Sequence, residues 1–229
     1  VTVCNVPAYS TAAVAQNTIS LLLNIATMTH IHSRYVSTGH WTDPTDHALV
    51  SVPMFELAGK TIGLIGCGDI GSAVGRIAAA FGMRVLAYRR HPDPSAGAYI
   101  RFVALDALYA QSDIVSLHCP LTPQTRGMID RAAIGRMKDG AVLLNTARGG
   151  LLCERDVADA LDCGKLYMAG LDVLCDEPPA PDSPLARHPR VICTPHISWM
   201  PRETRARLLR AAADNLLCFL EGNPQNVIV

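Results

Sequence analysis

The chain has 229 residues, of which 49% are hydrophobic and 17% are charged. This length accommodates one complete domain and part of another, and the composition excludes a disordered chain. The 20 lysines and arginines balance the 20 aspartates and glutamates. With a formal net charge of zero, no binding surface for nucleic acid or for anionic membranes is expected.

Eight cysteines are spread along the chain without a Cys-x-x-Cys pair or any other zinc-binding spacing. Several lie in apolar runs, as Cys193 does. Scattered thiols of this kind predict free cysteines, no metal site and a reducing compartment, which favours the cytoplasm. No charged segment precedes an apolar one near Val1, so no signal peptide is predicted.

The first predicted element is a long helix from about residue 11 to residue 33, with Ser10 or Thr11 as its N-cap. Its apolar stretch, residues 19–28, is shorter than the ~20 residues that span a bilayer. We therefore expect this helix to be buried against the fold or a partner subunit. The composition then changes to Trp, Pro, Asp and His over residues 39–53, which predicts an exposed loop.

Short apolar runs then alternate with helical stretches. This alternation predicts an α/β protein with a doubly wound parallel sheet, a Rossmann fold, with helices on both faces. The expected strands are 61–66, 84–87, 113–117, 141–144, 169–173 and 191–193, and the expected helices are 70–81, 105–111, 130–137 and 153–163. Residues 202–220 predict a final amphipathic helix that crosses back to another domain.

A glycine-rich turn lies between the first predicted strand and its helix. Residues 66–71 read GCGDIG, the G-x-G-x-x-G pattern of dinucleotide-binding folds. Gly66 permits the tight turn, Gly68 lets the backbone approach a pyrophosphate, and Gly71 lets the helix pack on the strand. A glycine-rich turn without a ligand is the alternative, but the strand-turn-helix context favours a dinucleotide site at the helix N-terminus.

The end of the second strand bears on the choice of cofactor. NAD-binding sites usually carry an acidic residue about 20 positions past the glycine loop, where it binds the ribose 2′-hydroxyl. This chain has Arg89 and Arg90 there, and a guanidinium would attract the 2′-phosphate of NADP. The sequence therefore favours NADP, although Asp93 or backbone groups could still serve NAD.

Three polar residues follow the ends of later strands: Arg148, Glu177 and His196. Each alone would also fit a structural role, as a surface arginine, a loop acid or a buried histidine. Because ligands bind beyond the carboxyl ends of parallel strands, we expect all three at one crevice beside the cofactor. Their chemistry suits reduction of a 2-keto acid: Arg148 would anchor the carboxylate, and His196 would act as acid/base with Glu177 orienting its ring.

At these residues the sequence resembles the D-2-hydroxyacid dehydrogenase family. The matching stretches, in the family's order and spacing, are residues 66–71, 116–122, 145–150, 170–178 and 194–196. The resemblance implies the same roles for Arg148, Glu177 and His196. It also implies that Asp172 and the backbone of Thr146 and Ala147 meet the nicotinamide end. Further cofactor contacts that it implies are made by Asp69, Ile70 and Cys119.

Other stretches are similar to the glycerate dehydrogenase branch, whose members reduce hydroxypyruvate and glyoxylate. These stretches are residues 5–10, 14–16 and 39–41, together with Trp199. Formate dehydrogenases share the architecture but carry glutamine in place of Glu177, which disfavours formate. The same resemblance makes His118 a structural residue on the cofactor side rather than a second acid.

The resemblance also implies a domain organisation. Family members carry roughly another hundred residues before the equivalent of Val1, which build most of a flavodoxin-like substrate domain. We therefore expect residues 1–7 to be a remnant of that domain, residues 8–197 to be the cofactor domain and residues 198–229 to return to the substrate domain. Such a chain would fold and bind cofactor but turn over weakly by itself.

The resemblance further implies a homodimer formed through the cofactor domain and its leading helix, acting on a small 2-hydroxy or 2-keto acid. Two alternatives stay open at this point: a cofactor-sensing protein like the corepressors that share this fold, and a truncated Rossmann protein with impaired catalysis.

Overall fold

The computed structural model describes residues 1–42, 52–91 and 97–229. The predicted loop 39–53 therefore lies partly, and Asp93 entirely, outside the described residues. The helices are α1 (Thr11–Thr27), α2 (Thr29–Ser37), α3 (Asp69–Ala80), α4 (Leu105–Gln111), α5 (Arg131–Arg136), α6 (Glu154–Asp162) and α7 (Arg202–Leu220). The strands are β1 (Thr61–Ile65), β2 (Arg84–Tyr88), β3 (Ile100–Phe102), β4 (Ile114–Leu117), β5 (Ala141–Asn145), β6 (Leu166–Leu171) and β7 (Val191–Cys193).

The seven strands form one parallel sheet in the order β3-β2-β1-β4-β5-β6-β7. The strand order reverses between β1 and β4, which is the topological switch point where open α/β sheets bind ligands. Because all these strands run in the same direction, their carboxyl ends lie along one edge. The predicted doubly wound parallel sheet is therefore confirmed.

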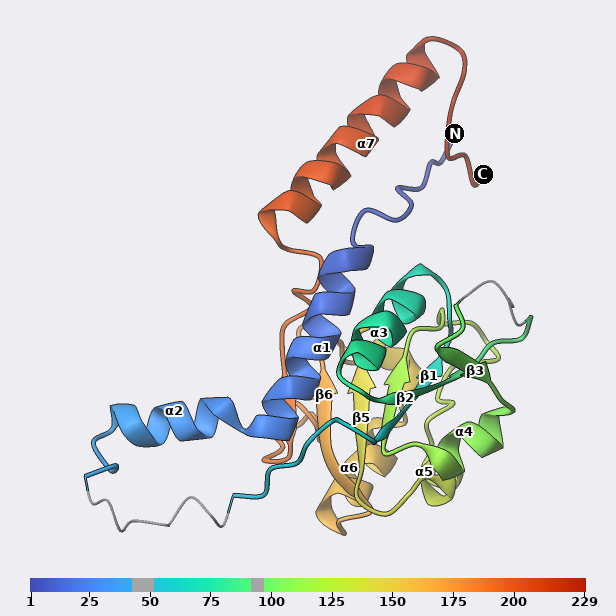
Figure 1. The fold of residues 1–229 in the computed structure, drawn as a ribbon. Coiled ribbons are helices and arrows are strands. Elements are labelled where there is room, and N and C mark those ends of the chain that lie inside the picture. The colour runs from blue at the N-terminus through green and yellow to red at the C-terminus, as the bar shows by residue number, and fades with distance from the viewer. Residues whose placement is uncertain (43–51, 92–96) are drawn as a thin grey trace.

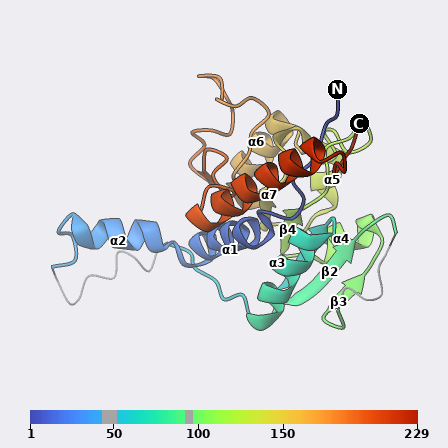
Figure 2. The ribbon, with the colours of Figure 1, turned by 90° about the horizontal axis from the view of Figure 1, so that it is seen from above.

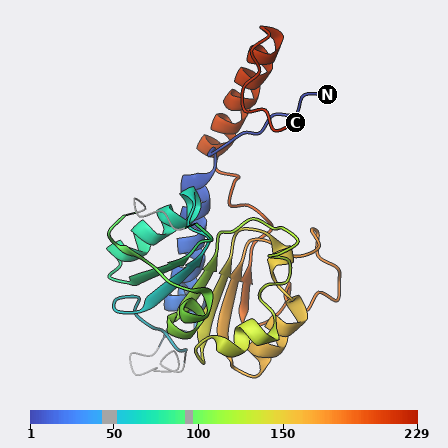
Figure 3. The same ribbon diagram turned by 90° about the vertical axis from the view of Figure 1, so that its right-hand side faces the viewer.

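Two apolar cores cover the two faces of the sheet. Side chains of α1 and α3, such as Leu22, Ile25 and Val74, pack on one face. Side chains of α4, α5 and α6, such as Leu108 and Leu161, pack on the other. Figure 3 shows these two helical layers on either side of the sheet. The near-continuous burial of β1, β4 and β5 follows from this arrangement, because a sheet covered on both faces exposes neither.

The leading helix is divided at Met28, which corrects the prediction of one helix over residues 11–33. Met28 adopts the left-handed conformation, with φ of 48°, and its N–H closes α1 on the carbonyl of Asn24. The chain then changes direction into α2, which projects away from the sheet (Figure 2). As expected, the apolar side of α1 is buried, including Leu22 and Ile25. Ser10 occupies the N-cap position, but its side chain makes no capping hydrogen bond.

Two strand predictions also need correction. The sheet has an edge strand, β3, that the sequence pattern did not predict, because three residues are too few to show a period. The strand expected at residues 169–173 begins earlier, at Leu166, after the turn at Gly164 with its φ of +78°. It ends at Leu171, so Asp172 lies beyond the strand, at the ligand-binding edge.

The C-terminal helix α7 leaves the sheet and carries the chain towards the N-terminus (Figure 1). The two ends of the chain pair as an antiparallel bridge between Cys4 and Val227. The N–H of Val3 donates to the carbonyl of Val229 at 2.8 Å, and Asn215 Nδ2 donates to the carbonyl of Asn5 at 2.9 Å. Within the described ranges, none of the helices combines the length and apolarity that a membrane crossing requires.

Candidate active site

The glycine loop connects β1 to α3 at the switch point. Gly66 has a φ of +94°, and a Cβ there would lie 2.6 Å from the backbone of His118. A Cβ on Gly71 would lie 2.3 Å from the carbonyl oxygen of Gly66, so both positions exclude larger residues. Around Gly68, by contrast, a Cβ would meet nothing within 4 Å.

This open backbone at Gly68 precedes the first turn of α3, which begins at Asp69 and has no side-chain cap. The N–H groups of the first helical turn are therefore left for a ligand rather than a capping side chain. A helix N-terminus of this kind attracts a negatively charged group. The geometry of this loop therefore suits the pyrophosphate of a dinucleotide. This agrees with the prediction that the cofactor contacts Gly66, Gly68, Asp69 and Gly71.

Arg89 lies directly after β2 and beside the glycine loop. Its Nη1 donates to the carbonyl oxygen of Cys67 at 3.3 Å. Both Arg89 and Arg90 are exposed. The guanidinium of Arg89 therefore places a positive charge next to the backbone that would face the phosphates.

A cleft of about 750 Å³ lies beyond the carboxyl ends of β4, β5 and β6. The structure brings seven predicted site residues to its walls: Ile70, Cys119, Thr146, Ala147, Arg148, Asp172 and His196. The glycine-loop positions and Arg89 do not line this cleft, and Glu177 reaches it only through His196. Tyr9, Ser10, Val14, Ser198 and Trp199 also line it. The sequence pattern contained no signal of a site role for Ser198, which lies in no motif, whereas Val14 belongs to the stretch 14–16 that resembles the glycerate dehydrogenase branch.

His196 and Glu177 form a close pair at the cleft. His196 Nδ1 lies 2.6 Å from Glu177 Oε2, and the other carboxylate oxygen, Oε1, accepts from the N–H of Leu174 at 3.1 Å. Both oxygens of Glu177 are therefore engaged, which holds the carboxylate against the ring. A carboxylate on Nδ1 leaves Nε2 as the ring nitrogen available for a ligand.

Asp172 organises the loop that carries His196. This carboxylate is 1% exposed. It accepts the hydroxyl of Thr194 and the N–H groups of Ile197 and Ser198. The N–H of His196 donates to the carbonyl oxygen of Asp172 at 2.8 Å. These bonds hold His196 in a left-handed conformation, with φ of 53°. A contact of Asp172 with the nicotinamide end stays a prediction, and the structure adds this role in shaping the loop.

The turn that carries Arg148 is built on the buried side chain of Asn145. Asn145 Nδ2 donates to the carbonyl oxygen of Arg148 at 2.9 Å, and Asn145 Oδ1 accepts from the N–H of Ala147 at 3.0 Å. Arg148 itself is exposed, and its Nη1 donates to the carbonyl of Ala147 at 2.6 Å. The sequence placed Asn145 in a family motif, but only the structure shows that it forms the turn.

His118 also lines the cleft, and it is partly buried beneath the glycine loop. Its Nε2 lies 2.9 Å from Ser116 Oγ. Desolvation lowers the pKa of His118 to about 4. The ring is therefore neutral near pH 7, which agrees with a structural rather than an acid role.

This lowered pKa predicts a pH-dependent stability. Between about pH 6.5 and pH 4 the unfolded chain binds a proton at His118 that the folded chain does not bind. The free energy of unfolding should therefore fall as the pH drops through this window, by on the order of 2 kcal/mol from this residue. Urea unfolding at pH 5 and pH 7.5, followed by circular dichroism, measures the difference. His118→Gln should reduce it, and an unchanged pH dependence in this variant would contradict the assignment.

Known proteins are similar to this chain in both sequence and fold. The family described as "D-isomer specific 2-hydroxyacid dehydrogenase, NAD binding domain" matches residues 19–198. Hydroxypyruvate reductase of Blautia hydrogenotrophica is 46% identical over 99% of this chain and 70% of its own length. Glycerate dehydrogenase of Methylorubrum extorquens is 35% identical over 100% of this chain and 71% of its own length.

Solved structures agree with these relatives. The TT0316 protein of Thermus thermophilus superposes with a TM-score of 0.91 at 41% identity, covering 100% of this chain and 72% of that one. D-lactate dehydrogenase from Aquifex aeolicus, solved with NAD and lactic acid, gives a TM-score of 0.88 at 31% identity over 97% of this chain and 70% of that one.

The relatives are named as reductases and dehydrogenases, which does not favour the corepressor-like or catalytically impaired alternatives. The dinucleotide loop, the cleft beside it and these matches together show that the chain belongs to the D-isomer specific 2-hydroxyacid dehydrogenase family, the NAD(P)-linked oxidoreductases of 2-hydroxy acids.

Proposed function

We propose that Arg148, Glu177 and His196 carry out the chemistry of this oxidoreductase. The observation that carries the proposal is the 2.6 Å contact between His196 Nδ1 and Glu177 Oε2 at a cleft that Arg148 also lines. The three residues come from loops after different strands, yet they serve one cleft. A cation, an acid/base group and its orienting carboxylate are the parts that 2-keto acid reduction needs.

When bound, the nicotinamide supplies the hydride that reduces C2 of the keto acid. The protein's own side chains bind the substrate carboxylate and protonate the oxygen on C2. Arg148 is the anchor: its Nη1 is held by the carbonyl of Ala147, which directs the guanidinium and leaves its other N–H groups for the substrate carboxylate. His196, held by Glu177 through Nδ1, would donate a proton from Nε2 to the oxygen on C2 as the alcohol forms. In the reverse direction the same nitrogen would accept that proton.

We propose hydroxypyruvate or glyoxylate, with glycerate or glycolate as the reduced product, as the substrate. The support is the 46% identity to a hydroxypyruvate reductase and the 35% identity to a glycerate dehydrogenase. Cofactor oxidation, followed at the nicotinamide absorbance, would be compared for hydroxypyruvate, glyoxylate and pyruvate. A higher kcat/KM for hydroxypyruvate or glyoxylate is expected, and a clear preference for pyruvate would contradict this proposal.

We propose NADP as the preferred form of the cofactor, on the strength of Arg89 beside the glycine loop. Arg89→Asp should raise the ratio of KM for NADPH to KM for NADH by about 10- to 100-fold, because a guanidinium–phosphate contact contributes about 1.5–3 kcal/mol. Initial rates with each cofactor measure this ratio. Arg84→Asp, at the opposite end of β2, makes the same charge change away from the loop and should leave the ratio unchanged. Equal ratios in the Arg89 variant and the wild type would point to NAD.

We further propose that residues 1–7 and 198–229 belong to a substrate domain and residues 8–197 to the cofactor domain. The pairing of Cys4 with Val227 away from the sheet supports this division. The exposed apolar side chains of α7, such as Leu209 and Leu220, support it too, since they suit a further packing surface.

We also propose a homodimer through α1, supported by a groove lined by Ile19, Leu23, Ile77 and Phe81 along this helix and α3. Light scattering of the purified protein tests the dimer, and a monomeric mass would contradict it.

We propose the cytoplasm as the location of the protein. The eight free thiols support a reducing compartment of this kind.

A further inference from the structure

Two adjacent residues of α1 contact two different loops of the cleft. Asn17 Nδ2 donates to Ser198 Oγ at 2.7 Å, and Thr18 Oγ1 lies 2.7 Å from Thr146 Oγ1. Thr18 is 0% exposed, and its own hydroxyl proton goes to the carbonyl of Val14 at 2.8 Å. A hydroxyl has a single proton, so Thr146 is the donor in the threonine pair.

These contacts reach the loops that carry the two groups assigned to the substrate. Thr146 is two residues before Arg148, and Ser198 is two residues after His196. Each loop is already fixed internally, the first by the Asn145 side chain and the second by Asp172. Motion of Thr146 or of Ser198 would therefore move the whole loop to which it belongs rather than a single side chain.

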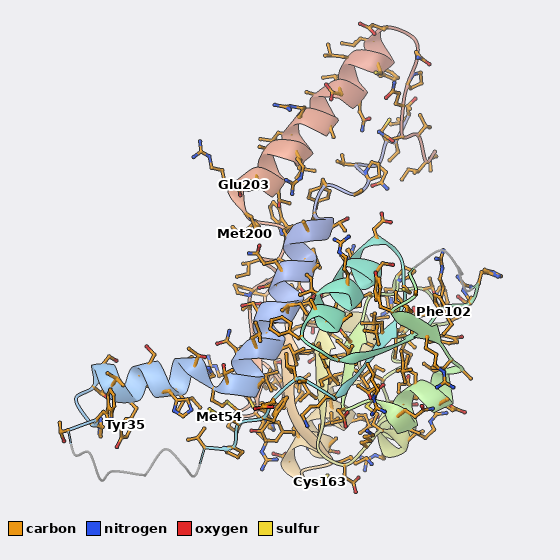
Figure 4. The ribbon with its side chains drawn as sticks, in the orientation of Figure 1. Tyr35, Met54, Phe102, Cys163, Met200 and Glu203 are labelled. Carbon is orange, nitrogen blue, oxygen red and sulfur yellow. The ribbon has the colours of Figure 1, made fainter. Side chains whose placement is uncertain are left out.

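Helix α1, which makes both contacts, is held firmly against the sheet. The face of α1 that packs on the sheet is buried, and Leu22 and Ile25 are both 0% exposed. Adjacent residues on a helix are separated by a fixed rise of about 1.5 Å, so the two contact points keep a constant spacing. Figure 4 shows Met200, two residues beyond Ser198, beside the N-terminal end of α1, where the chain passes on into α7.

We propose that Asn17 and Thr18 are positioning residues that set the separation of Arg148 and His196, with α1 as a spacer bound to both loops. The proposal rests on the roles assigned above to Arg148 and His196. Its physical basis is that hydride and proton transfer need both groups aligned on one substrate, and a displacement of about 1 Å can cost 100-fold in rate.

Trp199 offers a direct test of the Asn17 contact, because it follows Ser198 and lines the cleft. The chain has two tryptophans, and the other, Trp41, is 66% exposed, so a Trp41→Phe background isolates Trp199. In that background Asn17→Ala should shift the emission of Trp199 and raise its acrylamide quenching about two-fold. Asn24→Ala is the matched control, since among the described residues Asn24 Nδ2 donates to the carbonyl of Ser20 on the same helix. Asn24 lines the groove of the proposed dimer, so light scattering of this variant must give the wild-type mass. An unchanged Trp199 signal in the Asn17 variant would overturn the proposal.

Kinetics test both contacts. Asn17→Ala and Thr18→Val should each lower kcat about 10-fold, and KM for the reduced cofactor should change less than kcat, because the glycine loop that would hold the pyrophosphate is untouched. Thr18→Ser keeps the hydroxyl and should restore kcat, which a purely structural role of the methyl group would not produce. Thr27→Val is the matched control: the Thr27 hydroxyl makes the same bond to a carbonyl four residues back, at 2.7 Å, but lies outside the cleft. Thr27 lines the groove of the proposed dimer, so this variant must also keep the wild-type mass in light scattering.

The outcomes separate this proposal from the one on which it rests. If His196→Gln is inactive while the Asn17 and Thr18 variants keep full kcat, the spacer role is wrong and the assigned roles of Arg148 and His196 stand. If His196→Gln keeps full activity, those assigned roles are wrong, and the proposed spacing of the two groups has no catalytic meaning. In that case the fluorescence of Trp199 still reports whether Asn17 holds the loop.

Discussion

His196→Gln is expected to lower kcat about 1000-fold while leaving KM for the cofactor unchanged. Glutamine keeps a polar side chain of similar reach but cannot donate and recover a proton, and general acid–base catalysis contributes about 10²- to 10⁴-fold. The glycine loop is built from other residues, so cofactor affinity should not change. Stopped-flow or steady-state oxidation of the reduced cofactor with hydroxypyruvate gives both constants.

The protein contains its own control for this experiment. His188 Nε2 lies 3.2 Å from Asp162 Oδ1, which makes a second histidine–carboxylate pair that does not line the cleft. His188→Gln should keep kcat within two-fold of the wild type. Glu177→Gln should also lower kcat strongly, by about 100-fold or more, because the neutral amide no longer stabilises the protonated ring and can donate to Nδ1, which fixes the wrong tautomer. More than a tenth of wild-type activity in the His196 variant would refute the acid/base role.

Gly149→Ala is expected to destabilise the fold by about 3 kcal/mol and to lower activity with it. A Cβ at Gly149 would lie 1.9 Å from the carbonyl oxygen of Leu174 and 2.5 Å from the N–H nitrogen of Cys175. These are backbone atoms, so no flexible side chain can move aside. The N–H of Leu174 also holds Glu177, and therefore any shift that admits the methyl group disturbs the partner of His196.

Two other glycines calibrate this result. At Gly135, on α5, an added Cβ meets nothing within 4 Å, so Gly135→Ala should be neutral or stabilise by up to about 1 kcal/mol. At Gly150 the nearest atoms belong to the side chain of Leu121, which can rotate, so Gly150→Ala should cost less than Gly149→Ala. Urea unfolding curves rank the three variants. Equal midpoints for Gly149→Ala and the wild type would show that the backbone contact is looser than the structure indicates.

Much of the candidate site follows from local sequence patterns. The glycine spacing of residues 66–71 identifies the dinucleotide loop wherever a strand precedes it and a helix follows. Arg148, Glu177 and His196 could be assigned to one crevice because each follows a predicted strand. In a parallel sheet all such ends meet at one edge, so chain order alone predicts proximity. The close His196–Glu177 pair agrees with that reasoning.

Other parts of the site depend on residues far apart in the chain. Thr18 meets Thr146 across 128 positions, and Asn17 meets Ser198 across 181. Threonine and asparagine are common on helices and in turns, so neither residue type signals its partner. The role of Asp172 is similar: its acid side chain is visible in the sequence, but the loop amides that it binds are not.

The sequence by itself determined the alternation of strands and helices, the dinucleotide loop and the three polar residues after the strand ends, because hydrophobic period and glycine spacing are local properties. Only the tertiary structure decided where α1 breaks at Met28, that β3 pairs as an edge strand, and that the chain ends meet at Cys4 and Val227. The pairing of β3 and of the chain ends depends on hydrogen bonds between distant segments, and next to the break in α1 the carbonyl of Ala26 accepts the N–H of Phe55, so no short window of sequence contains these contacts.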